Sequence, residues 1–457
     1  MNILLLSPYP PYPPHGGGTM RIYQLARGLA EHHDVTCLSF AADAATERAL
    51  APLQRICRVV TVRGPASRGL PRRAWTTLTS PLPDMALRNA APAYAAALRA
   101  LLATETFDIV QAESIEMAGY LLHTSSHESG DQSSSYSRSA AGSRQPAAGG
   151  AHPSSSIFHP SMLVLDQFNA EYVLQKRAAL NSLRATIDAP IEHPTSKIQH
   201  LAGGMYSLAQ WQKLARYEAR VMRACDLVLA VAEEDRAIMR ALAPGVPIGV
   251  VPNGVDTAAF SRAALLCDRS GPIELRDSTL VFSGTLDFRP NVDAITWFVR
   301  EVLPLLWARR PGIRLLVVGK RPAPALLQLA AEGALVLTGE VPDARPYIAG
   351  AAVYIVPMRI GGGVRLKLLE ALALEAAVVS TAMGAEGVAG LRGGEHCLLA
   401  DEPAGFAAAV LRLLDDRPLG QRLGAAGRAL VRERYDWQVI VPRLEAIYQG
   451  ARAAHMS

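Results

Sequence analysis

Short apolar runs alternate with amphipathic helical patterns along the chain. Residues 2–6 (NILLL) are typical of a buried strand. A loop of prolines and glycines follows and ends at Thr19, which we interpret as a helix N-cap. Apolar residues then recur at helical spacing from Ile22 to Leu29, before a second apolar run at 34–40 (DVTCLSF). Strand, glycine loop, helix and strand form a βαβ unit, which predicts a parallel sheet.

The same alternation continues in two series. Further strands are predicted at 107–113, 162–168 and 225–231, and then at 279–284, 313–319, 334–339, 352–357 and 376–381. The pattern therefore predicts an α/β protein with two doubly wound domains joined near residue 252. Ligands bind such sheets at the carboxyl ends of the strands, so two facing domains would form a cleft between two such edges.

One segment breaks this pattern. Residues 123–160 are dominated by Ser, Ala and Gly and contain few large apolar side chains. Such a composition cannot bury enough surface to offset the entropy lost on ordering. We therefore predict a disordered insertion.

Composition and charge fit several kinds of partner. The 457 residues are 50% apolar and 19% charged, as in a typical globular protein. The net charge of +5 fits an anionic ligand, an anionic membrane surface or no charged partner at all. The five cysteines are scattered without CxxC spacing, which argues against a disulfide framework or a structural zinc site and suits a reducing cytoplasm. We expect no nucleic-acid partner.

The stretch GGGVRLKLLEALALEAAVVST (361–381) carries the clearest candidate chemistry. Its glycine triplet opens a predicted helix that presents Gly363, Lys367 and Glu370 on one face. Backbone N–H groups at a helix start suit phosphate, and glycines let an anion approach the backbone. The carboxylate could accept hydrogen bonds from sugar hydroxyls. An ordinary surface Lys–Glu pair is the alternative for this stretch alone.

The absence of several known sequence motifs narrows the possible classes of enzyme. The sequence contains no HExxH, GxSxG or GxxxxGK[ST] pattern, and its histidines lack metal-ligand spacing. The segment HGGGTMR (15–21) is not GxGxxG, which disfavours a nicotinamide oxidoreductase. The basic, partly apolar stretch 68–83 fits either an ordinary surface or contact with an anionic bilayer. The stretch 210–223 is interpreted as a helix packed on its own domain.

Together with segments elsewhere in the chain, 361–381 resembles the donor-binding segment of family 4 glycosyltransferases. The other similar segments are PYPPHGGGTMRIYQLARGLAEHHDVTCLSF, VPNGVDTAAF, FSGTLDFRPNVDAITWFVREVLP, LLVVGKRP, LTGEVPD and YDWQVIVPRLEAIY. They occur in the family's order and cover most of the chain outside 123–160 and 185–210.

The resemblance implies a GT-B fold of two Rossmann-like domains facing a cleft. An acceptor-binding domain would span 1–250, a nucleotide-sugar-binding domain 251–436, and a helix at 437–457 would cross back to the first domain. It implies a retaining hexosyltransferase that moves a sugar from a nucleotide-diphosphate sugar to a glycan or lipid-linked acceptor. No cofactor and no obligatory metal are implied. The enzyme would take part in cell-surface or exopolysaccharide biosynthesis. It would be located in the cytoplasm, either free or bound peripherally to the inner face of the membrane.

The resemblance also assigns roles residue by residue. The implied donor-binding residues are Glu370 for the ribose hydroxyls, Gly361, Gly362 and Gly363 for the sugar and phosphates, Gly339, Glu340 and Val341 for the base, and Arg289, Arg365 and Lys367 for the phosphate charge. The implied loop over the diphosphate is Gly16, Gly17 and Gly18. The candidate catalytic residues are Glu113 and Asn169.

The chain departs from the family pattern at several of its positions. Gly362 stands where the family often has a first glutamate, Thr285 and Pro290 where it has arginine and lysine, and Phe168 where it has histidine. Two other functions therefore stay open. They are a nucleotide-sugar epimerase on the same fold and a non-catalytic protein that binds a nucleotide or glycan.

Overall fold

The computed structural model describes residues 1–14, 16–65, 68–125, 162–188, 194–262, 265, 277–361 and 364–456. The predicted disordered insertion, 123–160, lies outside the described residues except for 123–125. Those three residues complete helix α7 (Ala118–Ser125), so the prediction was wrong for them. Leu121 is buried and anchors this helix, which then runs one further turn.

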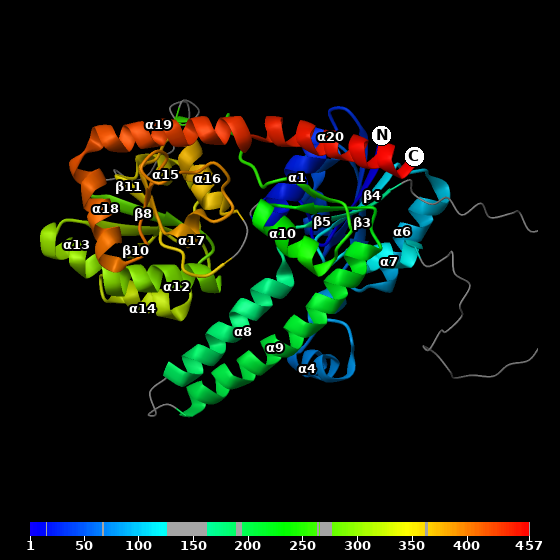
Figure 1. Cartoon of the computed structure of the whole chain (residues 1–457), viewed down its shortest axis with the longest axis horizontal. Coiled ribbons are helices and arrows are strands. Elements are labelled where there is room, and N and C mark those ends of the chain that lie inside the picture. The colour runs from blue at the N-terminus through cyan, green and yellow to red at the C-terminus, as the bar shows by residue number, and fades with distance from the viewer. Residues whose placement is uncertain are drawn as a thin grey trace, which may run out of the picture.

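Seven parallel strands form the N-terminal sheet in the order β3-β2-β1-β4-β5-β6-β7 (Figure 1). The strands are β1 (Asn2–Ser7), β2 (Asp34–Ala41), β3 (Arg58–Arg63), β4 (Ile109–Glu113), β5 (Met162–Gln167), β6 (Leu227–Ala230) and β7 (Ile248–Val250). The apolar periodicity did not predict β3, which begins and ends with arginine, or β7, which has only three residues. Side chains alternate between the two faces of β1, so that Leu4 and Leu6 enter one core and Ile3 and Leu5 the other.

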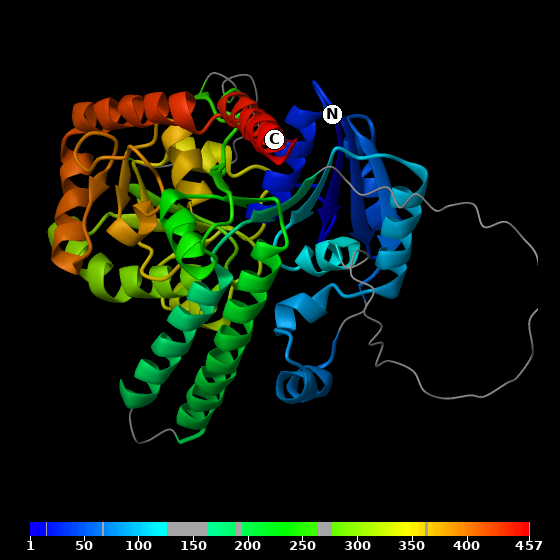
Figure 2. The same cartoon turned by 45° about the vertical axis from the view of Figure 1, so that its right-hand side comes forward.

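Helices cover both faces of this sheet. They are α1 (Gly17–Leu29), α2 (Ala44–Ala49), α3 (Ala51–Gln54), α4 (Leu70–Thr79), α5 (Asp84–Arg88), α6 (Pro92–Thr104), α7, α8 (Glu171–Asp188), α9 (Pro194–Arg223) and α10 (Glu233–Leu242). Figure 2 shows α8 and α9 as a long antiparallel pair that projects from the sheet, with α4 beside it. The stretch 210–223 indeed lies in α9, which contacts α7 and α10 of the same half.

The start of α1 differs from the prediction. Gly16, rather than Thr19, is the N-cap of this helix. Thr19 is the third helical residue, and its Oγ1 accepts a hydrogen bond from the Gly16 N–H at 2.9 Å. The glycine adopts the extended cap conformation, and the threonine completes the cap from inside the helix.

A second parallel sheet follows in the order β10-β9-β8-β11-β12-β13. Its strands are β8 (Thr279–Ser283), β9 (Arg314–Val318), β10 (Val336–Leu337), β11 (Val353–Val356), β12 (Val378–Ser380) and β13 (Leu398–Leu399). Its helices are α12 (Arg289–Trp297), the π-helical turn η1 (Phe298–Val302), α13 (Leu303–Arg309), α14 (Pro324–Ala331), α15 (Arg345–Gly350), α16 (Leu366–Ala373), α17 (Ala382–Ala385), α18 (Pro403–Asp415) and α19 (Arg417–Arg434). The strands of this half share one large apolar core with the helices around them.

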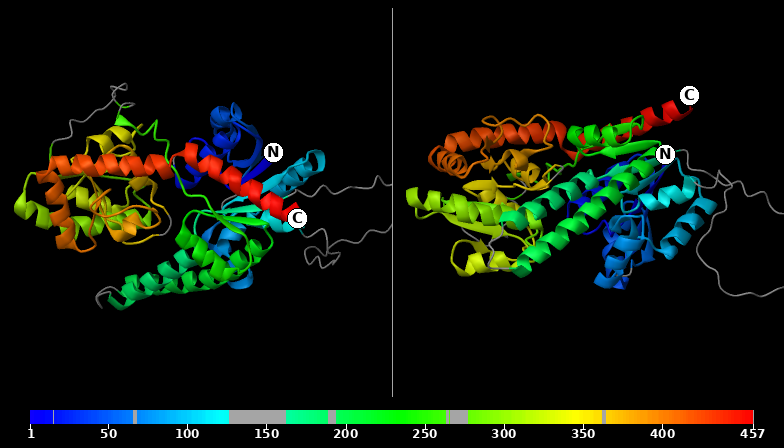
Figure 3. Two further views of the ribbon diagram at one scale, coloured as in Figure 1. Left: turned by 45° about the horizontal axis from the view of Figure 1, so that its top comes forward. Right: turned by 60° about the horizontal axis from the view of Figure 1, so that its bottom comes forward.

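The last helix, α20 (Trp437–Met456), returns to the first half of the chain and packs on α1 (Figure 3). Its apolar side chains Trp437, Ile440, Val441 and Leu444 join the core that contains β1. None of the described helices combines the length and apolar character that crossing a bilayer requires.

Close packing of α20 on α1 yields a stability prediction. A Cβ at Gly28 would lie 2.4 Å from Cγ2 of Val441, a β-branched side chain with little freedom to move. We expect Gly28→Ala to lower the free energy of unfolding by about 1–3 kcal/mol, measured in urea. Gly450→Ala is the matched control, because Gly450 lies on α20 with nothing within 4 Å of an added Cβ, and it should stabilise by up to about 1 kcal/mol. Equal effects of the two changes would contradict the packing argument.

Candidate functional site

The carboxyl end of β8 and the start of α16 meet around the ammonium group of Lys367. Its Nζ donates a hydrogen bond to Asn291 Oδ1 at 2.8 Å and lies 3.8 Å from the ring centre of Phe282. Asn291 is held in turn because its amide donates to the Thr285 carbonyl at 2.8 Å. Gly284 makes room for this arrangement, since a Cβ there would lie 3.0 Å from Nζ, and its φ of +151° disfavours other residues.

Desolvation shifts the pKa values of both Lys367 and its neighbour Glu370. Burial lowers the pKa of Lys367 to about 7, with further repulsion from Arg365 and an opposing effect of Glu370. Burial likewise raises the pKa of Glu370 to about 7, against the attraction of Lys367. An anion placed beside Lys367 would favour its charged form. The pair is therefore suited to a ligand that brings negative charge with it.

The helix that carries the pair begins later than predicted. Arg365 is the N-cap of α16 in an extended conformation, and the helix starts at Leu366. Gly362 and Gly363 lie outside the described residues, so the predicted face shared with Gly363 is not described. At Gly361, φ is +145°, and a Cβ would lie 2.3 Å from a guanidinium nitrogen of Arg365. Only a glycine leaves this arginine its position beside the helix start.

The N-terminal glycine loop faces this region. A Cβ at Gly17 would lie 3.4 Å from Cδ1 of Leu366, the first residue of α16. Gly18 packs against an aromatic side chain, since a Cβ there would lie 1.8 Å from the hydroxyl oxygen of Tyr9. The structure thus places Gly17 of this loop next to the first residue of α16.

A second link between the two halves comes from α8. Arg177 donates a hydrogen bond to the Gly361 carbonyl at 2.6 Å and lies 3.6 Å from the carboxylate of Glu386. Arg177, Glu386 and Asn169 line a cavity of about 60 Å³ together with the buried Asp235. Burial raises the pKa of Asp235 to about 6.

The two candidate catalytic residues lie at the carboxyl edge of the N-terminal sheet. Asn169 donates a hydrogen bond to Glu171 at 3.3 Å, and burial raises the pKa of Glu171 to about 7. Glu113 ends β4 opposite Asp166 of β5 and is fully buried. Burial and the neighbouring Asp166 raise its pKa well above the ordinary value. Glu113 therefore contacts protein groups in this structure, whereas Asn169 borders the cavity.

An ion pair that the sequence did not predict holds this edge together. Arg21 of α1 is fully buried and makes a bidentate pair with Asp166, at 2.7 and 2.8 Å. Its remaining nitrogen donates to the Pro252 carbonyl and to Asn253, both at 3.2 Å. One feature of the sequence could have indicated Arg21: it lies one turn before Leu25 and so places a charge on the apolar face of the predicted helix. Arg21 thus ties the glycine-loop helix to the segment that joins the two sheets.

The predicted base-binding loop is connected to the Lys367 site through β9. Lys320, just after β9, accepts a main-chain hydrogen bond from Leu286 at 2.9 Å and places its ammonium 3.3 Å from Glu340. Gly339 has a φ of +71°, and Val341 is partly buried. Arg289 is exposed at the start of α12. Loops after three neighbouring strands therefore border one region.

Among the described residues, no group of three or more His, Cys, Asp or Glu side chains is placed to hold a metal ion. The residues outside the sequence prediction that shape the site are Arg21, Asp166, Arg177, Asp235 and Asn291. Arg21 and Asp166 pair with each other across 145 positions, Arg177 bonds Gly361 across 184, and Asn291 bonds Lys367 across 76, so local sequence patterns do not predict these contacts.

Two doubly wound parallel sheets, linked by a returning helix and sharing a cavity lined from both halves, define the GT-B class of fold. Residues 277–416 match the family described as Glycosyl transferases group 1. The chain is 34% identical over 215 residues to the phosphatidyl-myo-inositol mannosyltransferase of Mycolicibacterium smegmatis. That match covers 45% of this chain and 52% of the relative, so the similarity spans about half of each protein.

Solved structures share the fold along the whole chain. Sucrose-phosphate synthase from Thermosynechococcus elongatus superposes with a TM-score of 0.65 at 17% identity, covering 99% of this chain and all of the other. Anabaena Alr3699/HepE in complex with UDP-glucose gives a TM-score of 0.59 at 13% identity, covering 98% of this chain and all of the other. At these identities the similarity establishes the fold alone.

Proposed function

We propose that the protein is a retaining glycosyltransferase that takes a hexose from a nucleotide-diphosphate sugar. The observation that carries the proposal is the half-buried Lys367–Asn291 contact beside Glu370, next to the N-terminal glycine loop. A diphosphate there would meet cations from Lys367 and Arg365. Stabilisation of a leaving diphosphate by fixed cations and N–H groups is a sufficient source of catalysis without a metal. The UDP-glucose complex of the Anabaena structure supports a donor of this kind.

The acceptor would occupy the N-terminal side of the site. Asn169 borders the cavity beneath α8 and could accept and donate hydrogen bonds to an acceptor hydroxyl. We propose a glycan or lipid-linked acceptor in cell-surface or exopolysaccharide synthesis, at the cytoplasmic side of the membrane. The name of the mycolicibacterial relative, which specifies a lipid acceptor, supports the lipid-linked case. Glu113 would act by positioning, since it is buried within the sheet edge.

The donor site is tested by calorimetric titration of UDP, GDP and ADP into the wild type and Glu370→Ala. We expect one nucleotide to bind in the micromolar range and the substitution to weaken it about tenfold or more, which is roughly 1.4 kcal/mol. Glu332→Ala is the control, because this carboxylate pairs with Gln328 at an exposed helix end of the same half. It should leave the affinity unchanged.

Turnover of the donor then separates the three functions. A transferase slowly hydrolyses its donor and transfers the sugar when an acceptor is present, an epimerase interconverts two nucleotide sugars, and a binding protein does neither. Tight nucleotide binding without any turnover would overturn the proposed activity while leaving the donor site in place.

A further inference from the structure

Helix α4 presents large apolar side chains to solvent although it is firmly fixed to the protein. Trp75 is 67% exposed and Leu78 is 83% exposed. The two residues are three apart and lie on one face of the helix, and Arg72, three residues before Trp75, extends the same stripe. The neighbouring helix α9 exposes Met205 to 63%. Exposed apolar groups gathered on one face indicate an interaction surface.

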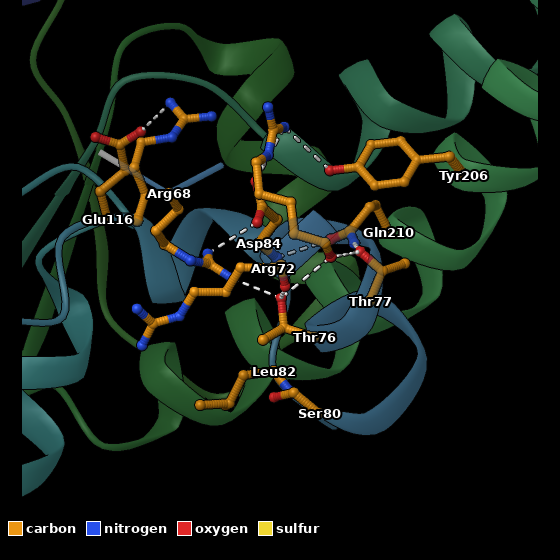
Figure 4. Close-up of polar contacts among 12 residues, drawn as sticks. Arg68, Arg72, Thr76, Thr77, Ser80, Leu82, Asp84, Glu116, Tyr206 and Gln210 are labelled. Atoms are coloured by element: carbon orange, nitrogen blue, oxygen red, sulfur yellow. Dashed lines mark hydrogen bonds and ion pairs between the residues drawn. The ribbon is translucent and has the colours of Figure 1, made fainter. Parts of the chain in front are cut away.

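The opposite face of α4 is anchored by a polar network (Figure 4). Arg68 donates hydrogen bonds to Asp84 at 2.9 Å and to Thr76 at 2.5 Å. Gln210 of α9 accepts from the main-chain N–H of Asp84 at 2.8 Å and donates to Thr77 at 3.2 Å. The helix is therefore held in one orientation, with its apolar stripe directed outward.

The charges around the stripe are positive. α4 contains Arg72 and Arg73 and no acidic residue. The nearby carboxylate of Asp84 is buried and paired with both Arg68 and Arg73. Figure 4 shows Arg72 directed away from this network. Arg72, Trp75 and Leu78 thus place a cation, an aromatic ring and an aliphatic side chain in one row. This combination suits the surface of an anionic bilayer, where charged headgroups border the acyl chains.

We propose that the exposed face of α4, defined by Arg72, Trp75 and Leu78, binds the surface of an anionic phospholipid bilayer. Trp75 would lie at the level of the headgroups, Leu78 at the boundary of the acyl chains, and Arg72 against lipid phosphates. A second copy of this chain fits the face less well. It would oppose arginine to arginine, and two apolar side chains fall far short of the roughly 800 Å² that each partner of a stable dimer buries.

The position of α4 agrees with a role at a membrane. α4 follows the carboxyl end of β3, so it lies at the same edge of the sheet as Glu113 and Asp166, which end or nearly end β4 and β5. Docking through α4 would therefore turn the candidate site toward the bilayer. The inference that a lipid-linked acceptor reaches the site in this orientation rests on the proposed function. The inference that the protein binds a vesicle does not.

The test is co-sedimentation of the full chain with vesicles of phosphatidylcholine alone or mixed equally with phosphatidylglycerol. We expect binding to the mixed vesicles that falls strongly between about 0.1 and 0.5 M salt, since screening weakens attraction to the lipid charge. Trp75→Ser with Leu78→Ser should reduce the partition coefficient about tenfold or more, and Arg72→Ala about fivefold. The melting temperature should not fall, because the altered side chains are exposed.

Leu305→Ser with Leu327→Ser is the matched control. It removes two apolar side chains that are 42% and 50% exposed on α13 and α14, away from α4, and should leave vesicle binding unchanged. No binding to anionic vesicles, or equal loss with both double variants, would overturn the proposal. A wild-type dimer by light scattering that the α4 variant converts to a monomer would also overturn it and assign the face to a second copy. Nucleotide binding should be intact in every variant, which separates a failure here from a failure of the donor site.

Discussion

Replacing Lys367 by Met is expected to weaken nucleoside diphosphate binding about tenfold to hundredfold, while the unliganded protein becomes more stable. The affinity falls because a charge-assisted hydrogen bond to phosphate contributes about 1.5–3 kcal/mol. The stability rises because the folded protein no longer has to hold a half-buried ammonium group against the Phe282 ring. We expect a gain of about 2 kcal/mol at pH 7, measured by urea unfolding.

The gain should depend on pH in a defined direction. The pKa of Lys367 is about 7 in the folded protein against an ordinary value of 10.5. Between these two values the unfolded chain binds a proton that the folded chain does not, so wild-type stability rises with pH. The advantage of Lys367→Met should therefore shrink from pH 7 to pH 10. The pKa of Glu370 is raised from 4.5 to about 7, so this residue affects stability at lower pH. Between these two values the folded chain binds a proton that the unfolded chain does not, and stability falls as pH rises.

Lys176→Met is the matched control, because this lysine is exposed on α8 and lies over the ring of Trp211. It should change neither nucleotide affinity nor the pH dependence. If Lys367→Met bound the nucleotide as tightly as the wild type, the lysine would have no part in holding the diphosphate.

The largest loss of stability is expected from Arg21→Met. The change leaves Asp166 buried without its bidentate partner, and breaking a buried pair in this way costs about 3–5 kcal/mol. It also removes the cation that opposes the raised pKa of Glu113. Because protonation of Glu113 relieves the cost of its buried charge, the deficit should be larger at pH 8 than at pH 5, measured as the difference in unfolding free energy.

Two further variants make this prediction specific. Arg27→Met on the same helix removes an exposed ion pair with Asp256 at 3.7 Å, and should cost less than about 1 kcal/mol. Arg21→Met with Asp166→Asn removes both charges and should recover at least about 1 kcal/mol relative to Arg21→Met alone. A deficit independent of pH, with no recovery in the double variant, would show that packing rather than charge makes Arg21 important.

The periodicity of the sequence predicted much of the fold. Apolar runs of five to seven residues identified most strands of both sheets, because buried parallel strands are apolar on both faces. The periodicity did not reveal two of the short strands, β7 and β13, nor β3, where polar residues break the pattern. Parallel pairing with longer neighbours, rather than local sequence, forms these strands.

The candidate site was predictable only in part, for a related reason. Lys367 and Glu370 share a helix, so their common face followed from spacing alone. Arg21 and Asp166 are separated by 145 positions, and Lys367 and Asn291 by 76. Such pairs depend on the order of the strands and on how the two halves meet, which no local pattern contains. The late start of α16 was missed because Arg365, which precedes it, is extended.

The return of α20 to α1 has a consequence for the order in which the chain can fold during synthesis. The apolar core around β1 includes Leu444 and Tyr448, near the last residue of the described chain. The ribosome therefore completes the second sheet before it releases the residues that finish the core of the first. We expect the first 250 residues, expressed alone, to expose the apolar face of α1 and to depend on chaperones, although N-terminal units commonly fold first.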